Sequence, residues 1–230
     1  GTADDMLTGP RLGYYAFVQP LPDKRHALFI ALNGEELTDF EGGIGGRISQ
    51  EQLAWLRRVL ACVKRPEHAH DLVFVLAHQP LGLLSVVGSE TRPELNVEDA
   101  LRESPNVVGY FYGHHHNHAI CANRRVDARG QLKTCTKFWE IETASLVEFP
   151  QEARMVRIKQ VGQQLAFLEV STFGEQLVEP DSQMARYVSL ARRGAERDHC
   201  VTHEARCSED KRPYRTDGNS TSARLFFKLP

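Results

Sequence analysis

Three histidines that follow hydrophobic segments are the residues of this sequence best suited to do chemistry. His78 comes directly after residues 72–77, which read L-V-F-V-L-A, and His114 and His116 come after residues 107–113, which read V-V-G-Y-F-Y-G. Alternate residues of an extended segment point the same way, so His114 and His116 can reach one side of a strand end. Imidazole nitrogens are common ligands of transition metals. The sequence therefore makes these three side chains candidate metal ligands.

The same histidines also have a structural interpretation. A histidine that ends a buried strand can be hydrogen-bonded within the core, and for His78 alone the two interpretations are balanced. The tract H-H-H-N-H can be a solvated loop with weak metal affinity. The preceding strand, the glycine and the G-H-x-H spacing together favour a ligand role for His114 and His116. Of the other imidazoles in the tract, His115 is expected to be exposed and His118 is assigned no role.

One well-marked helix is expected ahead of these strands. Ser49 and Gln52 have the S-x-x-Q spacing of a capping box, and apolar residues recur after them at helical spacing. Trp55 lies off the centre of the apolar face and is expected to pack against a neighbouring loop. The helix ends before a proline, and neither His68 nor His70 in the polar connection that follows is expected to be a ligand.

Strand patterns account for most of the remaining sequence before residue 175. Residues 14–18 and 27–32 predict a hairpin or an adjacent pair of strands. Between residues 72–77 and 107–112 lie a loop and a short helix that Asn96 caps, so these two strands are expected to be parallel. Three later segments predict further strands, the last two joined as a hairpin near Gly162: residues 138–141, 153–160 and 164–171.

Three other stretches are expected to be loops around the histidines. Residues 34–47 contain five glycines, four of them within residues 42–46, too many for a regular element. Phosphate cradling is the less favoured interpretation because the G-x-x-x-x-G-K-[ST] pattern is absent. Residues 81–93 are expected to form a rim beside the site. Residues 123–130 form a polar turn with Arg124 and Arg125, which either face solvent or orient a phosphate.

Composition restricts the class of protein. With 230 residues, 41% hydrophobic and 25% charged, the chain is typical of a globular protein. A net charge of −2 provides no basic field for nucleic acid, and no apolar run approaches the ~18 residues of a membrane-spanning helix, so neither nucleic acid nor membrane is an indicated partner. The five cysteines form no C-x-x-C pair, and Cys200 and Cys207 either bridge or remain thiols. The sequence assigns no cellular compartment.

A strand ending in H-x-P, a connecting helix and a strand ending in G-H-x-H together resemble the C-terminal half of a calcineurin-like metallophosphoesterase. The segments G-R-I-S-Q-E-Q-L-A-W-L and F-W-E-I-E-T-A-S agree with this resemblance, which covers about residues 14–170. It implies an α/β fold, a metallophosphoesterase-type two-sheet sandwich flanked by helices, with the N-terminal part missing. Residues 1–175 would be the C-terminal portion of that domain, and residues 176–230 a polar C-terminal extension, partly helical or disordered. Within the extension, residues 184–193 predict a helix and residues 223–229 a short strand or tail.

The resemblance implies a dinuclear site. His78 matches the H-x-P histidine and His114 the first histidine of G-H-x-H, which in this family bind the same metal. His116 matches the last histidine, which binds the other metal. The cofactors implied are two divalent or trivalent transition metal ions, Mn, Fe or Zn. The activity implied is hydrolysis of a phosphate ester, a small-molecule substrate, by an activated hydroxide.

The sequence departs from the family in its carboxylate and asparagine ligands. The D-x-H, G-D-x-x-D and G-N-H-[DE] motifs of the family do not occur in these 230 residues. Three histidines without a bridging carboxylate cannot hold two metal ions close together. The expectation is therefore a phosphoesterase whose other ligands lie upstream, inactive as this fragment. The alternative is a non-catalytic metal-binding or protein-interaction module on a degenerate phosphoesterase scaffold.

Overall fold

The structure is a computed structural model that describes residues 13–37, 45–68, 71–92, 94–122, 138–146, 151–162, 165–174, 182–183, 185–187, 189–190 and 222–229. Its elements in chain order are β1 (Tyr15–Pro20), β2 (His26–Ala31), β3 (Gly46–Ile48), α2 (Gln50–Val63), η1 (Pro66–His68), β4 (Leu72–Leu76), η2 (Leu81–Leu83), β5 (Leu84–Val86), α3 (Val97–Arg102), β6 (Val107–Tyr112), β7 (Ala119–Ala122), β8 (Trp139–Glu142), β9 (Ala153–Val161), β10 (Leu165–Phe173) and β11 (Ser222–Lys228).

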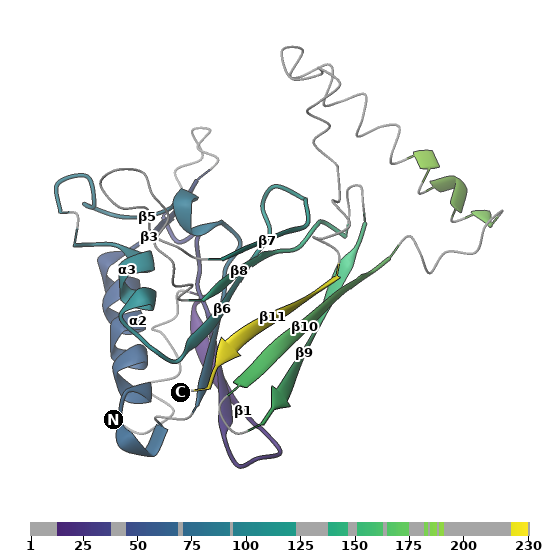
Figure 1. The fold of residues 1–230 in the computed structure, drawn as a ribbon. Helices are drawn as coiled ribbons and strands as arrows, with labels where there is room; N and C mark the ends of the chain where they lie inside the picture. The colour runs from purple at the N-terminus through teal and green to yellow at the C-terminus, as the bar shows by residue number, and fades with distance from the viewer. Residues whose placement is uncertain are drawn as a thin grey trace, which may run out of the picture.

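A six-stranded sheet with the order β1-β2-β4-β6-β8-β7 forms the centre of the molecule (Figure 1). Strands β2, β4, β6 and β8 are parallel to one another, and β1 and β7 join them antiparallel at the two sides. The expected β1–β2 hairpin and the expected parallel pairing of β4 with β6 are confirmed. The carboxyl ends of the four parallel strands meet at one edge, here called the carboxyl edge, and their amino ends meet at the opposite amino edge.

Both faces of this sheet are covered (Figure 1). Helices α2 and α3 pack on one face with Val73 and Val75 of β4, and a second sheet of order β11-β10-β9 packs on the other with Leu72 and Phe74. This alternation explains why β4 is a continuous apolar run, since its first four residues each belong to one of the two cores. The fold is thus mixed α/β with several sheets and few helices, as the sequence predicted in outline.

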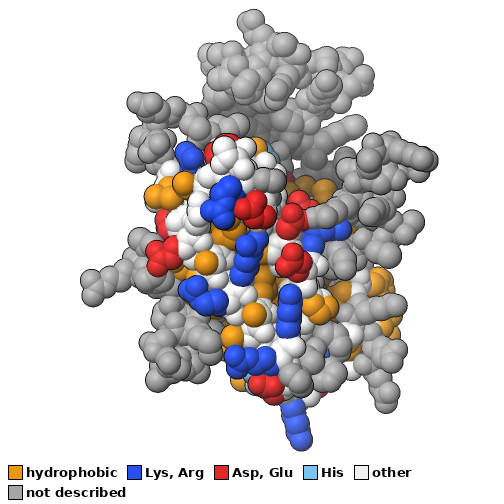
Figure 2. Space-filling view, turned by 90° about the vertical axis from the view of Figure 1, so that its left-hand side faces the viewer, with side chains coloured by type: hydrophobic (Ala, Val, Ile, Leu, Met, Phe, Trp, Pro, Cys, Tyr) orange, Lys and Arg blue, Asp and Glu red, His pale blue; other side chains and the backbone are white. Residues whose placement is uncertain are grey.

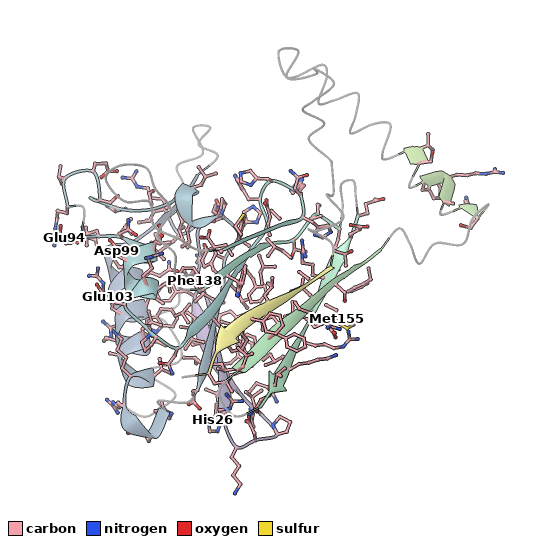
Figure 3. The ribbon with its side chains drawn as sticks, viewed as in Figure 1. His26, Glu94, Asp99, Glu103, Phe138 and Met155 are labelled. Atoms are coloured by element: carbon pink, nitrogen blue, oxygen red, sulfur yellow. The ribbon has the colours of Figure 1, made fainter. Side chains whose placement is uncertain are left out.

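The helix side of the molecule carries charged side chains, whereas the three-stranded sheet exposes some apolar ones. Figure 2, which views the helix side, shows basic and acidic side chains interspersed over α2, where Arg57 and Arg58 are exposed. Figure 3 places Phe138 inside the molecule and Met155 on the outer side of the three-stranded sheet, where Met155 is 42% exposed. In the part of the chain that the structure describes, no helix is long and apolar enough to cross a membrane.

Helix α2 begins where the sequence predicted, but its cap differs from a capping box. The Ser49 hydroxyl accepts a hydrogen bond from the Gln52 backbone N–H at 3.0 Å, as expected. The reciprocal bond comes from Glu36, whose Oε2 accepts from the Ser49 N–H at 3.0 Å. The buried Gln52 amide instead bonds both backbone groups of Asn33, at 2.8 and 3.1 Å. The cap therefore ties the helix start to the chain that leaves β2.

Three short strands were not predicted. β3 and β5 pair in parallel as a small separate sheet, so the expected loops over residues 34–47 and 81–93 are wrong in these parts. β7 was likewise not foreseen. Strands of three or four residues carry too little alternation to be recognised, and their formation depends on a partner distant in sequence. The Trp55 ring packs against the ring of Tyr14, the residue that precedes β1, with centroids 4.8 Å apart. Both rings lie in the main core.

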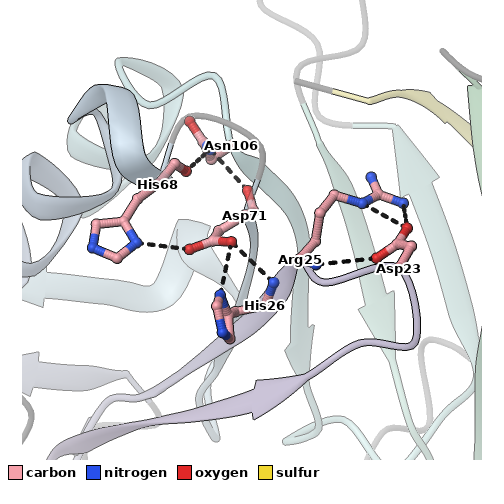
Figure 4. A network of polar contacts seen from close by, with 6 residues as sticks. All are labelled: Asp23, Arg25, His26, His68, Asp71 and Asn106. Atoms are coloured by element: carbon pink, nitrogen blue, oxygen red, sulfur yellow. Dashed lines mark hydrogen bonds and ion pairs between the residues drawn. The ribbon is translucent and has the colours of Figure 1, made fainter.

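A polar network closes the amino edge (Figure 4). The buried Asp71 carboxylate accepts the His26 backbone N–H at 2.9 Å, and it lies 3.2 Å from His26 Nδ1 and 2.9 Å from His68 Nδ1. The Asn106 amide donates to the Asp71 carbonyl at 2.8 Å. His68 thus has a structural partner in Asp71.

Several expectations lie outside the described residues. These include the turn with Arg124 and Arg125 and the cysteines at 200 and 207. Of the helix expected over 184–193, residues 185–187 and 189–190 are helical. The end of the polar extension forms β11, which pairs with β10, so the strand alternative is confirmed there.

Candidate metal centre

His78 and His114 lie at the carboxyl edge, just beyond adjacent parallel strands. The strand pairing continues past the last residues of β4 and β6, because Ala77 N–H donates to the Phe111 carbonyl and Gly113 N–H donates to the His78 carbonyl, each at 3.0 Å. The two histidines are therefore held side by side by backbone hydrogen bonds. This is the edge at which open α/β sheets commonly place their ligands.

The imidazole rings turn nitrogen atoms toward each other. His78 Nε2 and His114 Nδ1 are 3.4 Å apart, and the rings are nearly perpendicular, with an interplanar angle of 85°. Two nitrogen ligands of one tetrahedral zinc ion, each about 2.0–2.1 Å from the metal, are separated by ~3.4 Å. The pair thus has the spacing of two ligands of one ion. The same distance also permits one ring to donate a hydrogen bond to the other.

The backbone of the histidine loop is strained. His114 and His116 have φ values of 79° and 57°, in the left-handed region that non-glycine residues seldom occupy. Such conformations cost of the order of 1 kcal/mol or more and persist where neighbouring structure imposes them, often at functional sites. The bond from His115 N–H to the Gly113 carbonyl, at 3.0 Å, tightens the same turn.

The surroundings of His114 favour its neutral form. Burial lowers the pKa of His114, the neighbouring imidazoles of His115 and His78 lower it further, and the Glu35 carboxylate opposes them. A neutral imidazole keeps a nitrogen lone pair available for a metal ion. Glu35 follows β2, which neighbours β4 in the sheet. The Gln79 side chain donates a hydrogen bond to the Glu35 carboxylate.

The packing of Gln79 requires glycine at two positions of residues 34–47. Its side chain is 1% exposed, and a Cβ atom built on Gly34 or Gly46 would lie 1.9 or 2.6 Å from Gln79 side-chain atoms. The Gln79 carbonyl accepts a hydrogen bond from the Tyr110 hydroxyl at 2.7 Å. These two glycines thus make room for the side chain of the residue that follows His78.

Two further histidines of the tract contact carboxylates. His115, which is exposed as expected, has its Nδ1 2.9 Å from Oε1 of the buried Glu142. Burial raises the pKa of Glu142. His118 is buried, and burial lowers its pKa to about 4, so it is neutral near pH 7. Its Nε2 lies 2.9 Å from Glu152, without the alignment of a hydrogen bond, so this contact is not a charged pair near neutral pH.

The described residues fit one metal ion better than two. The nitrogen atoms of His78 and His114 have the spacing of two ligands of one ion, but no group of three His, Cys, Asp or Glu side chains in the described ranges is arranged to hold an ion. His116 lies in the same loop, and its binding of a second ion stays a prediction.

Sequence reasoning did not assign Glu35 and Glu142 to this site. Glu142 belongs to the segment F-W-E-I-E-T-A-S, which predicted a strand. A glutamate at the end of a predicted buried strand could have marked it as a residue of the carboxyl edge. Glu35 carried no such signal, because only the sheet order brings the end of β2 beside the end of β4.

Comparisons with known proteins give a distant similarity. No family model matches the chain. No curated protein matches it. The crystal structure of a dimetal phosphatase from Danio rerio is similar to it, with a TM-score of 0.43 and 14% identity, over 74% of this chain and 62% of that chain. This chain thus spans less than two thirds of that phosphatase.

Proposed function

We propose that this chain contributes to a metal-dependent phosphoesterase, in which His78 and His114 bind one transition metal ion. The observation that carries the proposal is the 3.4 Å separation of His78 Nε2 and His114 Nδ1 beyond adjacent parallel strands. The strained loop that presents His114 and its neutral imidazole give further support. The H-x-P and G-H-x-H motifs, in the order found in metallophosphoesterases, suggest the class of reaction.

Each side chain has a defined part in this proposal. His78 and His114 bind the ion, and His116 is proposed to reach a second ion whose other ligands are not among the described residues. Such an ion supplies Lewis acidity toward a phosphoryl oxygen and lowers the pKa of bound water. Mn, Fe or Zn fit a histidine-containing site of this kind. The proposed substrate is a small-molecule phosphate ester.

The test is metal-dependent hydrolysis by the protein at its full natural length. We expect Mn²⁺ or Zn²⁺ to activate hydrolysis of p-nitrophenyl phosphate or bis(p-nitrophenyl) phosphate, and His114→Ala to abolish it. His68→Ala is the matched control, because His68 lies at the amino edge, and it should keep the activity. Turnover that survives His114→Ala overturns the proposal. Metal binding at His78 and His114 with no turnover of either ester favours the non-catalytic module instead.

A further inference from the structure

Glu142 is placed where it can control the conformation of the histidine loop. It is the last residue of β8 and pairs with Tyr112 at the end of β6 and with Ala119 at the start of β7. Residues 113–118 connect these two strands, so the loop leaves the sheet and returns to it beside the same glutamate. The Glu142 side chain is only 6% exposed.

One oxygen of this carboxylate holds the middle of the loop. Glu142 Oε1 accepts the His115 backbone N–H at 3.3 Å and lies 2.9 Å from His115 Nδ1. The His115 ring in turn contacts the His114 ring, with centroids 5.1 Å apart. The carboxylate therefore contacts both the side chain and the backbone N–H of the residue between His114 and His116, and it shares that N–H with the Gly113 carbonyl, which lies 3.0 Å away.

The neighbouring residues need such an anchor. His114 and His116, on either side of His115, both have positive φ values. Two left-handed non-glycine residues so close together relax to other conformations unless surrounding contacts hold them. The backbone bond from Gly113 to His78 fixes the start of the turn, and the Glu142 contacts fix its centre.

We propose that Glu142 is a positioning residue that acts through His115 to hold His114 in its metal-binding conformation. This inference rests on the proposed metal site at His78 and His114. Residues that orient metal ligands without touching the metal typically change metal affinity by ~10–100-fold when removed. Glutamine at position 142 keeps an oxygen that accepts both hydrogen bonds, whereas alanine removes it.

The experiment measures Mn²⁺ and Zn²⁺ affinity by isothermal titration calorimetry on the full-length protein and its variants. We expect Glu142→Ala to weaken binding by ~10-fold or more, and Glu142→Gln to restore affinity to within ~3-fold of wild type. Glu140→Ala is the matched control, since Glu140 is the same residue type two positions earlier on β8 and its pairing partner is Tyr110. It should leave affinity unchanged.

A second measurement does not depend on the metal. Amide hydrogen exchange of the metal-free protein should be faster at residues 114–116 in Glu142→Ala than in wild type or Glu142→Gln, while exchange in β4 is unchanged. If Glu142→Ala binds metal as tightly as wild type and exchanges no faster in the loop, the positioning role is overturned. If wild type binds no metal but the exchange of Glu142→Ala rises as expected, the loop anchor stands and the proposed function fails.

Discussion

At the amino edge of the six-stranded sheet, His26 and His68 share the buried carboxylate of Asp71 (Figure 4), whereas at the carboxyl edge His78 and His114 turn nitrogen atoms toward each other. The amino-edge pair sits in ordinary backbone conformations, and its carboxylate also binds the His26 backbone N–H. At the carboxyl edge His114 has a left-handed backbone and a depressed pKa.

This difference separates a structural use of histidine from a candidate ligand site. A histidine bonded to a buried carboxylate joins elements together, and its nitrogen is already engaged. Two imidazoles that face each other beyond strand ends gain little stability from their mutual contact, yet they have the spacing of two ligands of one ion. Substitutions at the two edges should therefore affect different measurements.

The largest expected effect is on metal binding at the carboxyl edge. His78→Ala or His114→Ala removes one of two proposed ligands, so detectable Zn²⁺ binding in calorimetry should disappear. His26→Ala at the amino edge is the matched control and should bind as wild type does. Equal loss in His26→Ala would show that the effect is general unfolding, and retained binding in both carboxyl-edge variants would refute the ligand assignment.

The second effect is on stability at the amino edge. Asp71→Ala removes the acceptor shared by His26 and His68 and leaves a buried backbone N–H without its partner, so the free energy of unfolding should fall by about 3 kcal/mol. Asp71→Asn, which keeps one acceptor oxygen, should lose about half as much. Urea denaturation measures both variants. A fall in metal affinity with unchanged stability would contradict the division between the edges.

A smaller effect on the free energy of unfolding is expected beside the candidate metal centre. Gly46→Ala places a Cβ 2.6 Å from the Gln79 side chain, and overpacking of this kind should lower the free energy of unfolding by about 2 kcal/mol. Gln79→Ala should relieve the clash, so the two substitutions should be less harmful together than the sum of their separate effects. Strict additivity in urea denaturation would show that the two residues do not interfere.

The smallest effect concerns the cap of α2. Ser49→Ala removes the acceptor of the Gln52 N–H and should lower the free energy of unfolding by about 1 kcal/mol. Metal affinity should not change, because the substitution removes only the hydroxyl that accepts the Gln52 N–H and leaves His78 and His114 in place. Ser49→Asp, which keeps a capping oxygen, should recover most of the loss in thermal denaturation. A loss of more than about 2 kcal/mol would mean that the cap also supports Glu36, which accepts the Ser49 N–H.

Strong local signals made parts of the fold predictable. The apolar runs before His78 and His114, the Ser49 cap and the Asn96 cap each depend on a few adjacent residues, and the structure has these elements at those places. The position of both histidines beyond strand ends follows directly. Short strands such as β3 and β5 were missed because each depends on the other for its hydrogen bonds, and paired residues are 38 positions apart in the sequence.

The sequence by itself determined which residue types end the parallel strands, and hence that His78 and His114 meet at one edge of a sheet. Only the tertiary structure decided which groups surround them. The sheet order brings Glu35 and Gln79 together, and the pairing of β8 with both β6 and β7 places Glu142 under the histidine loop. These contacts join residues far apart in the chain, and the free energy that selects them comes from packing of whole elements, which no local pattern encodes.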